Sequence, residues 1–311
     1  MTGGDNPGLA IGLRLLSGLL FAGMLICVKA VSDAIPLGEI VFFRSAFALL
    51  PLIVFLWLRG EFPQGLATKR PFGHVLRASF GACALFASFA AVARLNVAEA
   101  ILLAQLAPIL MAIAAVGLLR ERLTIWRVAG LALGFAGVVV MVWPELGGGG
   151  AGNSVGAGAS AGDGARLAGI SLGLLSAGLT ALALIMVRSL NRTESPGAIA
   201  LYFVIASMAG ALVTLPWGWV MPGGWALVLL VSAGLVGGFA HIAMTLAFRY
   251  AEASRLAPFE YVALLWPVLA DLLIFRLPMT TSFLVAMPLV LSGAAVAAAE
   301  RGRAARRRQV S

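Results

Sequence analysis

The sequence predicts an all-α integral membrane protein with ten transmembrane helices, arranged as two inverted five-helix repeats with both termini in the cytoplasm. Composition, the number of long apolar runs and a similarity between the two halves lead to this prediction. Of the 311 residues, 61% are hydrophobic and 11% are charged, and the mean hydropathy is +1.01. A soluble domain is roughly half apolar and a quarter charged. The composition therefore excludes a soluble enzyme and a disordered chain.

Ten apolar runs are long enough to be membrane spans, since a helix needs about 20 mostly apolar residues to cross ~30 Å of hydrocarbon. No basic stretch precedes the first run, so we expect a retained span there and not a cleaved signal peptide. The expected spans cover residues 9–32, 36–58, 72–93, 97–119, 124–143, 167–187, 197–217, 224–249, 255–275 and 280–300.

The basic residues predict the orientation and the location. The formal net charge is +9, and five arginines lie among the last eleven residues. With the N-terminus in the cytoplasm, most Lys and Arg fall in cytoplasmic segments, as membrane proteins prefer. This placement at the ends of spans indicates contact with lipid and not with nucleic acid. A bacterial inner membrane is the expected location.

A glycine-rich stretch divides the chain into two similar halves. Residues 146–166 resemble a flexible external linker. They separate a first repeat, residues 1–145, from a second, residues 167–300, and residues 301–311 form a basic tail. Paired features of the halves keep the same spacing: Leu15, Leu16 and Ser17 with Leu174, Leu175 and Ser176, and Pro36 and Phe43 with Pro196 and Phe203.

Five spans in each half make the second repeat enter the membrane in the opposite sense to the first. Inverted repeats of this kind are typical of transporters that work by alternating access, with a substrate site near the bilayer midplane. We therefore interpret the chain as a secondary transporter.

Several short motifs resemble the drug/metabolite transporter superfamily, EamA type. They are the stretch EIVFFR at residues 39–44, the turn LLRERLT at residues 118–124 before a helix with Gly134 and Gly137, and prolines in the middle of spans. The resemblance covers the whole chain except the linker and the tail. It implies a ten-helix carrier of small metabolites.

Two further segments are similar to segments of S-adenosylmethionine uptake carriers within that family: RPFGHVLR at residues 70–77 and APFEY at residues 257–261. Amino-acid exporters share the same fold. The second half departs from the family pattern, because Arg276, Leu277 and Pro278 stand where the acidic turn residue Glu121 would recur.

Arg44 is the most informative ionisable residue, because it lies near the middle of the second span. An ionisable side chain at that depth costs at least ~2.5–3.5 kcal/mol. Glu39 lies about 140° around the same helix, so a direct pair with Arg44 is not expected. Arg44 either pairs with a carboxylate elsewhere or contacts an anionic group of the substrate.

The other candidate residues fall into two groups. Candidates for substrate binding, besides Arg44, are Gln105, His241, Glu260, Tyr261 and Trp266. Candidates for the vestibule or for gating are Glu39, His74, Arg77, Pro108 and Pro267. The two prolines stand at corresponding mid-span positions, where kinked helices often mark a transport site.

Structural alternatives exist for these residues. Arg77 could snorkel to the headgroups, His241 could bond to the backbone, and either proline could merely shape packing. Asp271 and Arg276 are expected to form an interface ion pair. Cys27 and Cys83 are expected to be small buried residues and not a disulfide or metal site.

The sequence thus favours a secondary carrier for a small polar metabolite, such as an amino acid or an S-adenosylmethionine-like molecule. Its partners would be that substrate, membrane lipid and protons as a coupling ion, without cofactor or metal. A nonspecific drug or lipid flippase is the first alternative, and it would have a largely uncharged cavity. A membrane-embedded enzyme is less favoured, since HExxH and paired midplane aspartates are absent. No GxxxxGK[ST] loop for ATP hydrolysis occurs.

Overall fold

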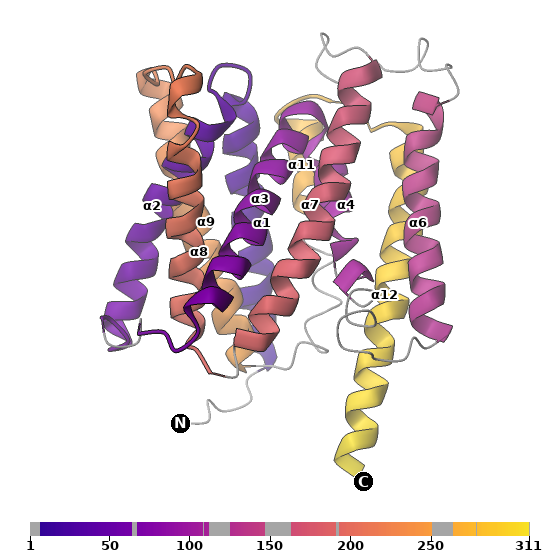
Figure 1. Cartoon of the computed structure of the whole chain (residues 1–311). Coiled ribbons are helices and arrows are strands. Elements are labelled where there is room, and N and C mark those ends of the chain that lie inside the picture. The colour runs from indigo at the N-terminus through magenta and orange to yellow at the C-terminus, as the bar shows by residue number, and fades with distance from the viewer. Residues whose placement is uncertain are drawn as a thin grey trace.

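The computed structural model describes residues 7–63, 67–107, 109–111, 125–146, 163–190, 193–250, 264–277 and 279–310. Every regular element in these ranges is helical (Figure 1). The elements are α1 (Pro7–Val31), α2 (Leu37–Leu58), α3 (Pro71–Arg94), α4 (Val97–Ala104), α6 (Ile125–Leu146), α7 (Asp163–Leu190), α8 (Pro196–Leu212), η2 (Leu215–Trp217), α9 (Gly224–Tyr250), α11 (Leu265–Leu273) and α12 (Thr281–Val310).

Within the described residues, five helices are long and apolar enough to cross a membrane: α1, α2, α3, α7 and α9. Shorter apolar helices lie at residues 197–212 and 281–293, among others. The all-helical class and the membrane-spanning character are therefore confirmed for the described residues. A described helix falls within each of the ten expected ranges; the total of ten membrane crossings stays a prediction.

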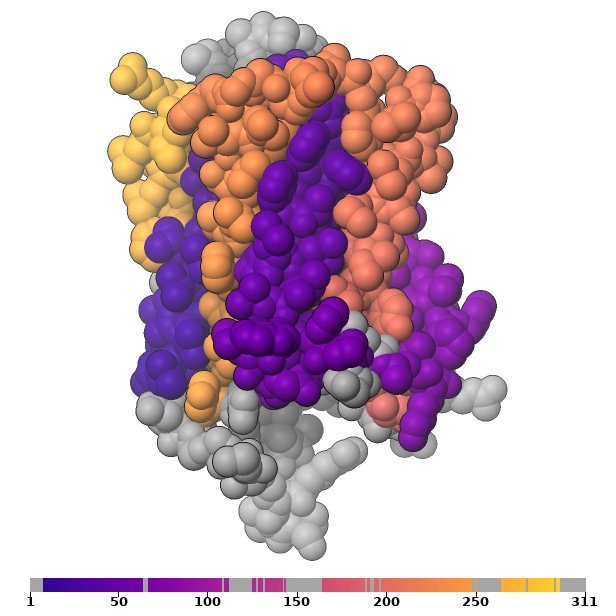
Figure 2. All heavy atoms as spheres, turned by 90° about the vertical axis from the view of Figure 1, so that its left-hand side faces the viewer, coloured from indigo at the N-terminus to yellow at the C-terminus, as the bar shows by residue number. Residues whose placement is uncertain are grey.

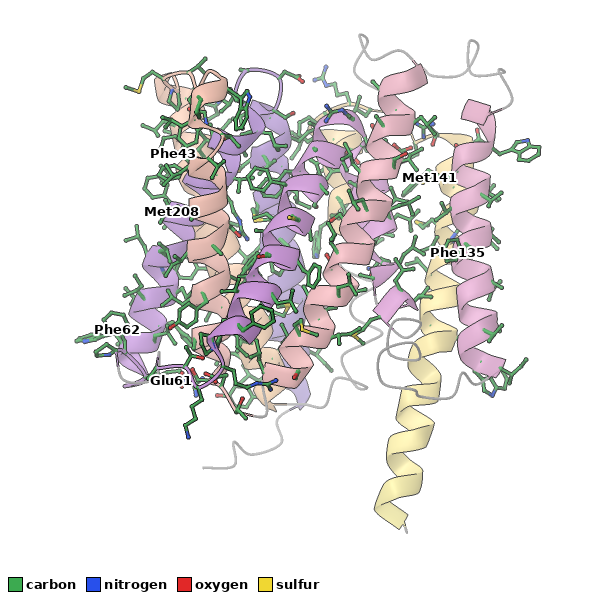
Figure 3. The ribbon with its side chains drawn as sticks, in the orientation of Figure 1. Phe43, Glu61, Phe62, Phe135, Met141 and Met208 are labelled. Atoms are coloured by element: carbon green, nitrogen blue, oxygen red, sulfur yellow. The ribbon has the colours of Figure 1, made fainter. Side chains whose placement is uncertain are left out.

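The surface of the bundle is apolar, as a lipid-facing surface must be. Leu50, Val54 and Leu58 share one face of α2 and are 54%, 53% and 71% exposed. Figure 2 shows α2 as a stripe between α9 and α8, with which it packs. In Figure 3, Phe135 is one of many apolar side chains of α6, most of which project outward.

The helices alternate in direction between two ends of the bundle. We call the end where α1 begins and α12 ends the terminal end, and the opposite end, where α6 ends and α7 begins, the linker end (Figure 1). Glu61 and Phe62, just after α2, lie at the terminal end (Figure 3). The first helices of the two halves therefore run in opposite directions: α1 runs toward the linker end and α7 runs away from it.

Helix packing follows a regular pattern. The most extensive contacts are α1 with α9, α3 with α7, and α6 with α12. Glycines permit the last of these, because a Cβ on Gly137 would lie 3.0 Å from the Ala286 carbonyl oxygen and one on Gly293 would meet the Gly130 carbonyl at 2.5 Å. The helices α2 and α8 also pack on each other.

Three boundaries differ from those expected. The fourth span was expected to be continuous over residues 97–119, but α4 ends at Ala104 and turns at Gln105. Pro108 lies outside the described residues. The tenth span continues as helix to Val310, because the alanines and arginines of the tail are strong helix formers.

The third difference concerns Pro267. It was expected in the middle of a long span, but it lies in the first turn of α11, which begins at Leu265. A proline in a first turn costs no helix hydrogen bond, since the amides there have no intrahelical partner.

Candidate functional site

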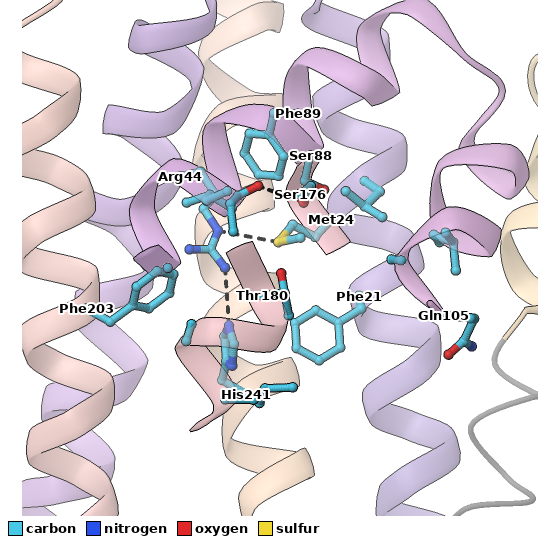
Figure 4. A pocket seen from close by; sticks show the side chains of 18 of the residues that line it. Phe21, Met24, Arg44, Ser88, Phe89, Gln105, Ser176, Thr180, Phe203 and His241 are labelled. Atoms are coloured by element: carbon cyan, nitrogen blue, oxygen red, sulfur yellow. Dashed lines mark hydrogen bonds between the residues drawn. The ribbon is translucent and has the colours of Figure 1, made fainter. Parts of the chain in front are cut away.

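A cavity of about 400 Å³ lies where α1, α2, α3, α4, α7, α8 and α9 meet (Figure 4). Its wall includes cationic or basic side chains (Arg14, Arg44, Arg77, His241), polar side chains (Gln105, Ser88, Ser176, Thr180) and the rings of Phe21, Phe89 and Phe203. None of the described residues in this wall is acidic. The cavity therefore combines positive charge with an aromatic surface.

Arg44 of α2 lies inside the bundle and is only 2% exposed. Its Nε lies 3.5 Å from the sulfur of Met24, and its Nη2 lies 3.3 Å from Nε2 of His241 (Figure 4). Its Nη1 has no hydrogen-bond partner among the described residues. A buried guanidinium normally has a carboxylate partner, so this environment is unusual.

The contact between Arg44 and His241 defines the state of the histidine. A guanidinium carries only donors, so Nε2 of His241 must be the acceptor and carries no proton. The imidazole is then neutral and adds no counter-charge. Phe21 packs edge-on against the same ring, with the centroids 4.9 Å apart, which fixes its orientation.

Close helix packing places Arg44 at this depth. The helix α9 approaches α2 through glycines: a Cβ on Gly234 would lie 2.9 Å from the Arg44 carbonyl oxygen. A Cβ on Gly237 would lie 2.7 Å from the Met24 sulfur. Larger residues at these positions would separate α2 from α9 and displace the side chains that surround the guanidinium.

Arg77 of α3 also faces this cavity. Its guanidinium carbon lies 4.3 Å from the centroid of the Phe203 ring of α8, within the range of a cation–π interaction. Its Nε and Nη1 are buried without a hydrogen-bond partner in the described part of the chain. A Cβ on Gly81 would lie 2.7 Å from Nη1, so glycine provides the space for this stack.

A polar network connects several helices at the linker end of the bundle. The Asp271 carboxylate of α11 accepts hydrogen bonds from the first amides of α4, those of Val97 at 3.1 Å and Ala98 at 2.7 Å. Glu99 accepts one from Arg166 of α7 at 2.6 Å and one from the Thr280 hydroxyl at 3.2 Å.

This linker-end network, Glu99, Arg166, Asp271 and Thr280, corrects one expectation. Asp271 caps the N-terminus of α4 and does not pair with Arg276, because two backbone amides at a helix start are a better partner for a carboxylate. Lys29 extends the polar contacts to α1, since its Nζ donates to the carbonyl of Leu95 at 2.9 Å.

A separate buried pair lies at the terminal end. Glu194 accepts a hydrogen bond from the Lys69 amide at 3.0 Å, and its other oxygen lies 3.4 Å from His74 Nε2. Burial raises the pKa of the Glu194 carboxyl, but the hydrogen bonds from Lys69, His74 and Thr68 outweigh it, so the pKa lies below its usual range. These bonds favour the ionised carboxylate and connect α3 to the segment before α8.

The structure brings four of the expected residues together at the cavity: Arg44, Gln105, His241 and Arg77. Glu39 lies elsewhere, buried, where it accepts a hydrogen bond from the Val220 amide at 3.0 Å, and His74 pairs with Glu194. Trp266 and Pro267 belong to α11 and are not part of the wall of this cavity. The three remaining candidates lie outside the described residues: Glu260, Tyr261 and Pro108.

Several wall residues were not expected from the sequence. Phe21, Phe203 and Ser176 carried no signal of their own, although Phe203 and Ser176 stand at positions that the repeat matched with Phe43 and Ser17. The Ser176 hydroxyl donates to the Ala84 carbonyl at 2.9 Å and so connects α7 to α3. Cys83 also differs from expectation, because it is exposed; both cysteines are free.

The comparisons with known proteins agree with the resemblance seen in the sequence. Residues 8–143 match the EamA-like transporter family. A riboflavin transporter of Rhizobium johnstonii is 29% identical, over 78% of this chain and 74% of that protein. An S-adenosylmethionine uptake transporter of Rickettsia prowazekii is 27% identical, over 76% and 74% respectively.

A pseudopaline exporter of Pseudomonas aeruginosa is 28% identical, over 82% of this chain and 83% of that protein. One crystal structure superposes with a TM-score of 0.62 at 23% identity, covering 93% of this chain and 96% of the other. That likeness shows a shared fold. The relatives' names include uptake as well as export.

Proposed function

Because the chain carries an EamA-like transporter domain at residues 8–143, we propose that it is a multi-pass membrane carrier that moves a small polar metabolite by alternating access. The observation that carries this proposal is the cavity around Arg44, which is enclosed by helices from both halves of the chain. Intramembrane charges facing a cavity are typical of a substrate pathway.

The packing pattern supports two inverted repeats. In a twofold arrangement, α1, α2, α3 and α6 of the first half would correspond to α7, α8, α9 and α12 of the second half. The contact of α1 with α9 then corresponds to the contact of α7 with α3, and both are among the most extensive in the bundle. The contacts of α2 with α8 and of α6 with α12 map onto themselves. A twofold axis in the membrane plane would produce this pattern, and such symmetry permits two nearly equivalent conformations.

The position of the cavity supports an inward-facing state. Arg14 and Val187 line it near the terminal end, whereas the linker-end network connects α4, α7 and α11 on the opposite side. With both termini in the cytoplasm, as the basic residues favour, the substrate site would be reached from the cytoplasm of a bacterial inner membrane and closed from outside.

The substrate class follows from the relatives and the wall. Relatives are named for riboflavin, S-adenosylmethionine and pseudopaline, and we propose an amino acid or an S-adenosylmethionine-like metabolite for this chain. A nonspecific lipid or drug flippase would require a largely uncharged cavity, and Arg44 and Arg77 argue against it. The relatives are transporters by name, which argues against a membrane-embedded enzyme.

Transport by purified protein in proteoliposomes tests the proposal. The panel consists of amino acids, S-adenosylmethionine, riboflavin and polyamines, in uptake and in counterflow, with and without a proton gradient. We expect saturable counterflow of at least one compound, and Arg44→Ala and Glu260→Gln should each lower its rate while membrane insertion stays normal. Gln105→Ala should weaken the apparent substrate affinity.

The matched control is Arg59→Gln, since Arg59 pairs with Glu61 near the surface at 2.9 Å, away from the cavity. Wild-type rates in Arg44→Ala or Glu260→Gln would remove that residue from the site. No transport of any compound in either direction would contradict the carrier function itself.

A further inference from the structure

We propose that the cavity binds its substrate through a carboxylate, which supplies the counter-ion that Arg44 does not have among the described residues and is attracted by Arg77 as well. The inference rests on the proposed carrier function and defines its substrate class. It requires an anionic or zwitterionic substrate and excludes a purely cationic one.

The environment of Arg44 is the first argument. The described groups in contact with its guanidinium are a thioether and a neutral imidazole, and neither carries negative charge. An ion buried without a partner of opposite charge costs several kcal/mol. Nη1 is buried and unpaired, so one strong donor remains for a group that enters the cavity.

Arg77 supplies a second positive group in the same wall. Its guanidinium carbon lies 4.3 Å from the centroid of the Phe203 ring, which is neutral, so this contact compensates only part of the charge. Its unpaired Nε and Nη1 lie in the plane of the guanidinium. The N–H of Nε and those of Nη1 point to different edges of the guanidinium, so each atom can donate a single charge-assisted hydrogen bond to a carboxylate oxygen.

The remaining wall favours a substrate with an apolar or aromatic part. Phe21, Phe89 and Phe203 present rings to the cavity, and Gln105 and Thr180 offer neutral hydrogen-bonding groups. A volume of about 400 Å³ lies within the usual range for small-molecule sites. An ammonium group alone would meet like charges and no described carboxylate in this wall.

Three fragments of nearly equal shape test the inference in the purified full-length protein: benzoate, benzamide and benzylamine. Thermal unfolding in detergent at constant ionic strength is the readout. We expect benzoate to raise the unfolding temperature in a saturable manner, with an apparent affinity at least tenfold above that of benzamide and no effect from benzylamine. Equal effects of benzoate and benzamide, or no effect of benzoate, would overturn the inference.

Substitutions locate the effect. Arg44→Gln should weaken benzoate binding roughly 10- to 100-fold, the usual effect of losing a charged hydrogen bond, and Arg77→Gln should weaken it less. Arg44→Lys keeps the positive charge but not the planar guanidinium, so its loss of benzoate affinity should be intermediate. Such a graded loss would show that the effect of Arg44→Gln does not come from misfolding alone. If Arg44→Gln still binds benzoate as tightly as the wild type does, benzoate binds at another site. The control variant Arg59→Gln should bind benzoate with wild-type affinity.

Counterflow separates this inference from the proposed function. S-adenosylmethionine and its decarboxylated form share the sulfonium and the adenosine but differ in the carboxylate. Transport of polyamines or of the decarboxylated form at rates unaffected by Arg44→Gln would leave the carrier intact and refute the carboxylate site. Benzoate binding that depends on Arg44, without transport of any compound, would refute the carrier and leave the anion site.

Discussion

Gly81 determines how the Arg77 side chain lies at the cavity. A Cβ at this position would lie 2.7 Å from Arg77 Nη1 and 2.9 Å from the Phe203 ring, both below any ordinary contact distance. The side chain of Arg77 or the ring must therefore move when any other residue replaces this glycine. Gly81 is itself part of the cavity wall, and its lack of a side chain positions the Arg77 guanidinium there.

Gly81→Ala should displace the guanidinium from the Phe203 ring and lower the unfolding temperature, since overpacking usually costs about 1–3 kcal/mol. It should also weaken benzoate binding in the assay described above. Gly178→Ala in α7 is the control, because a Cβ there meets nothing within 4 Å and alanine favours helix over glycine. Equal behaviour of the two variants would show that the Arg77 stack does not depend on Gly81.

At the scale of elements, the start of α4 depends on a side chain from the other half of the chain. Its N-terminal amides at Val97 and Ala98 donate to both oxygens of Asp271, and Asn96 with Glu99 completes a capping box. Because α4 has only eight residues, these end contacts contribute much of what fixes its position. The Asp271 side chain thus caps α4 and also holds α4 against α11 at the linker end.

The substitutions at Asp271 should form a graded series. Asp271→Asn keeps one oxygen acceptor, whereas Asp271→Ala leaves both amides without a side-chain acceptor, so alanine should lower the free energy of unfolding more, by roughly 1–3 kcal/mol. Thermal unfolding in detergent measures both changes. Glu61→Gln, a substitution outside the membrane-spanning helices, serves as the control. An asparagine variant as unstable as the alanine variant would mean that the charge, and not the hydrogen bonds, stabilises this contact.

At the scale of the whole molecule, the start of α1 and the end of α12 lie at the same end of the bundle, opposite the end of α6 and the start of α7 (Figure 1). An epitope inserted between Leu146 and Asp163, where α6 ends and α7 begins, should therefore react with antibody in intact spheroplasts. A tag after Ser311 should react only after permeabilisation, because the basic tail favours the cytoplasmic side. The reverse pattern would invert the orientation, and labelling of both tags from outside would contradict the helix directions.

Sequence reasoning predicted the helical class and part of the site, for identifiable reasons. Arg44 could be found because a charged side chain within an apolar run is costly and rare, and therefore indicates that the side chain faces the interior of the bundle. Phe203 and Gly81 could not, since aromatic and small residues are common in every span and only packing reveals their role. Asp271 was misjudged because its partners are backbone amides distant in sequence, which no spacing rule can predict.

Arg14, Arg44 and Arg77, the arginines among the described wall residues, all come from residues 1–145, whereas the second half contributes the His241 imidazole and the Phe203 ring to this wall. Consider two identical copies of the first half that pack on each other as the two halves do here. They would place twice as many guanidinium groups around one small cavity, and these like charges would repel each other. Joining two different halves in one chain therefore lets the described wall concentrate its positive charge on one side, so that a single substrate carboxylate can balance it.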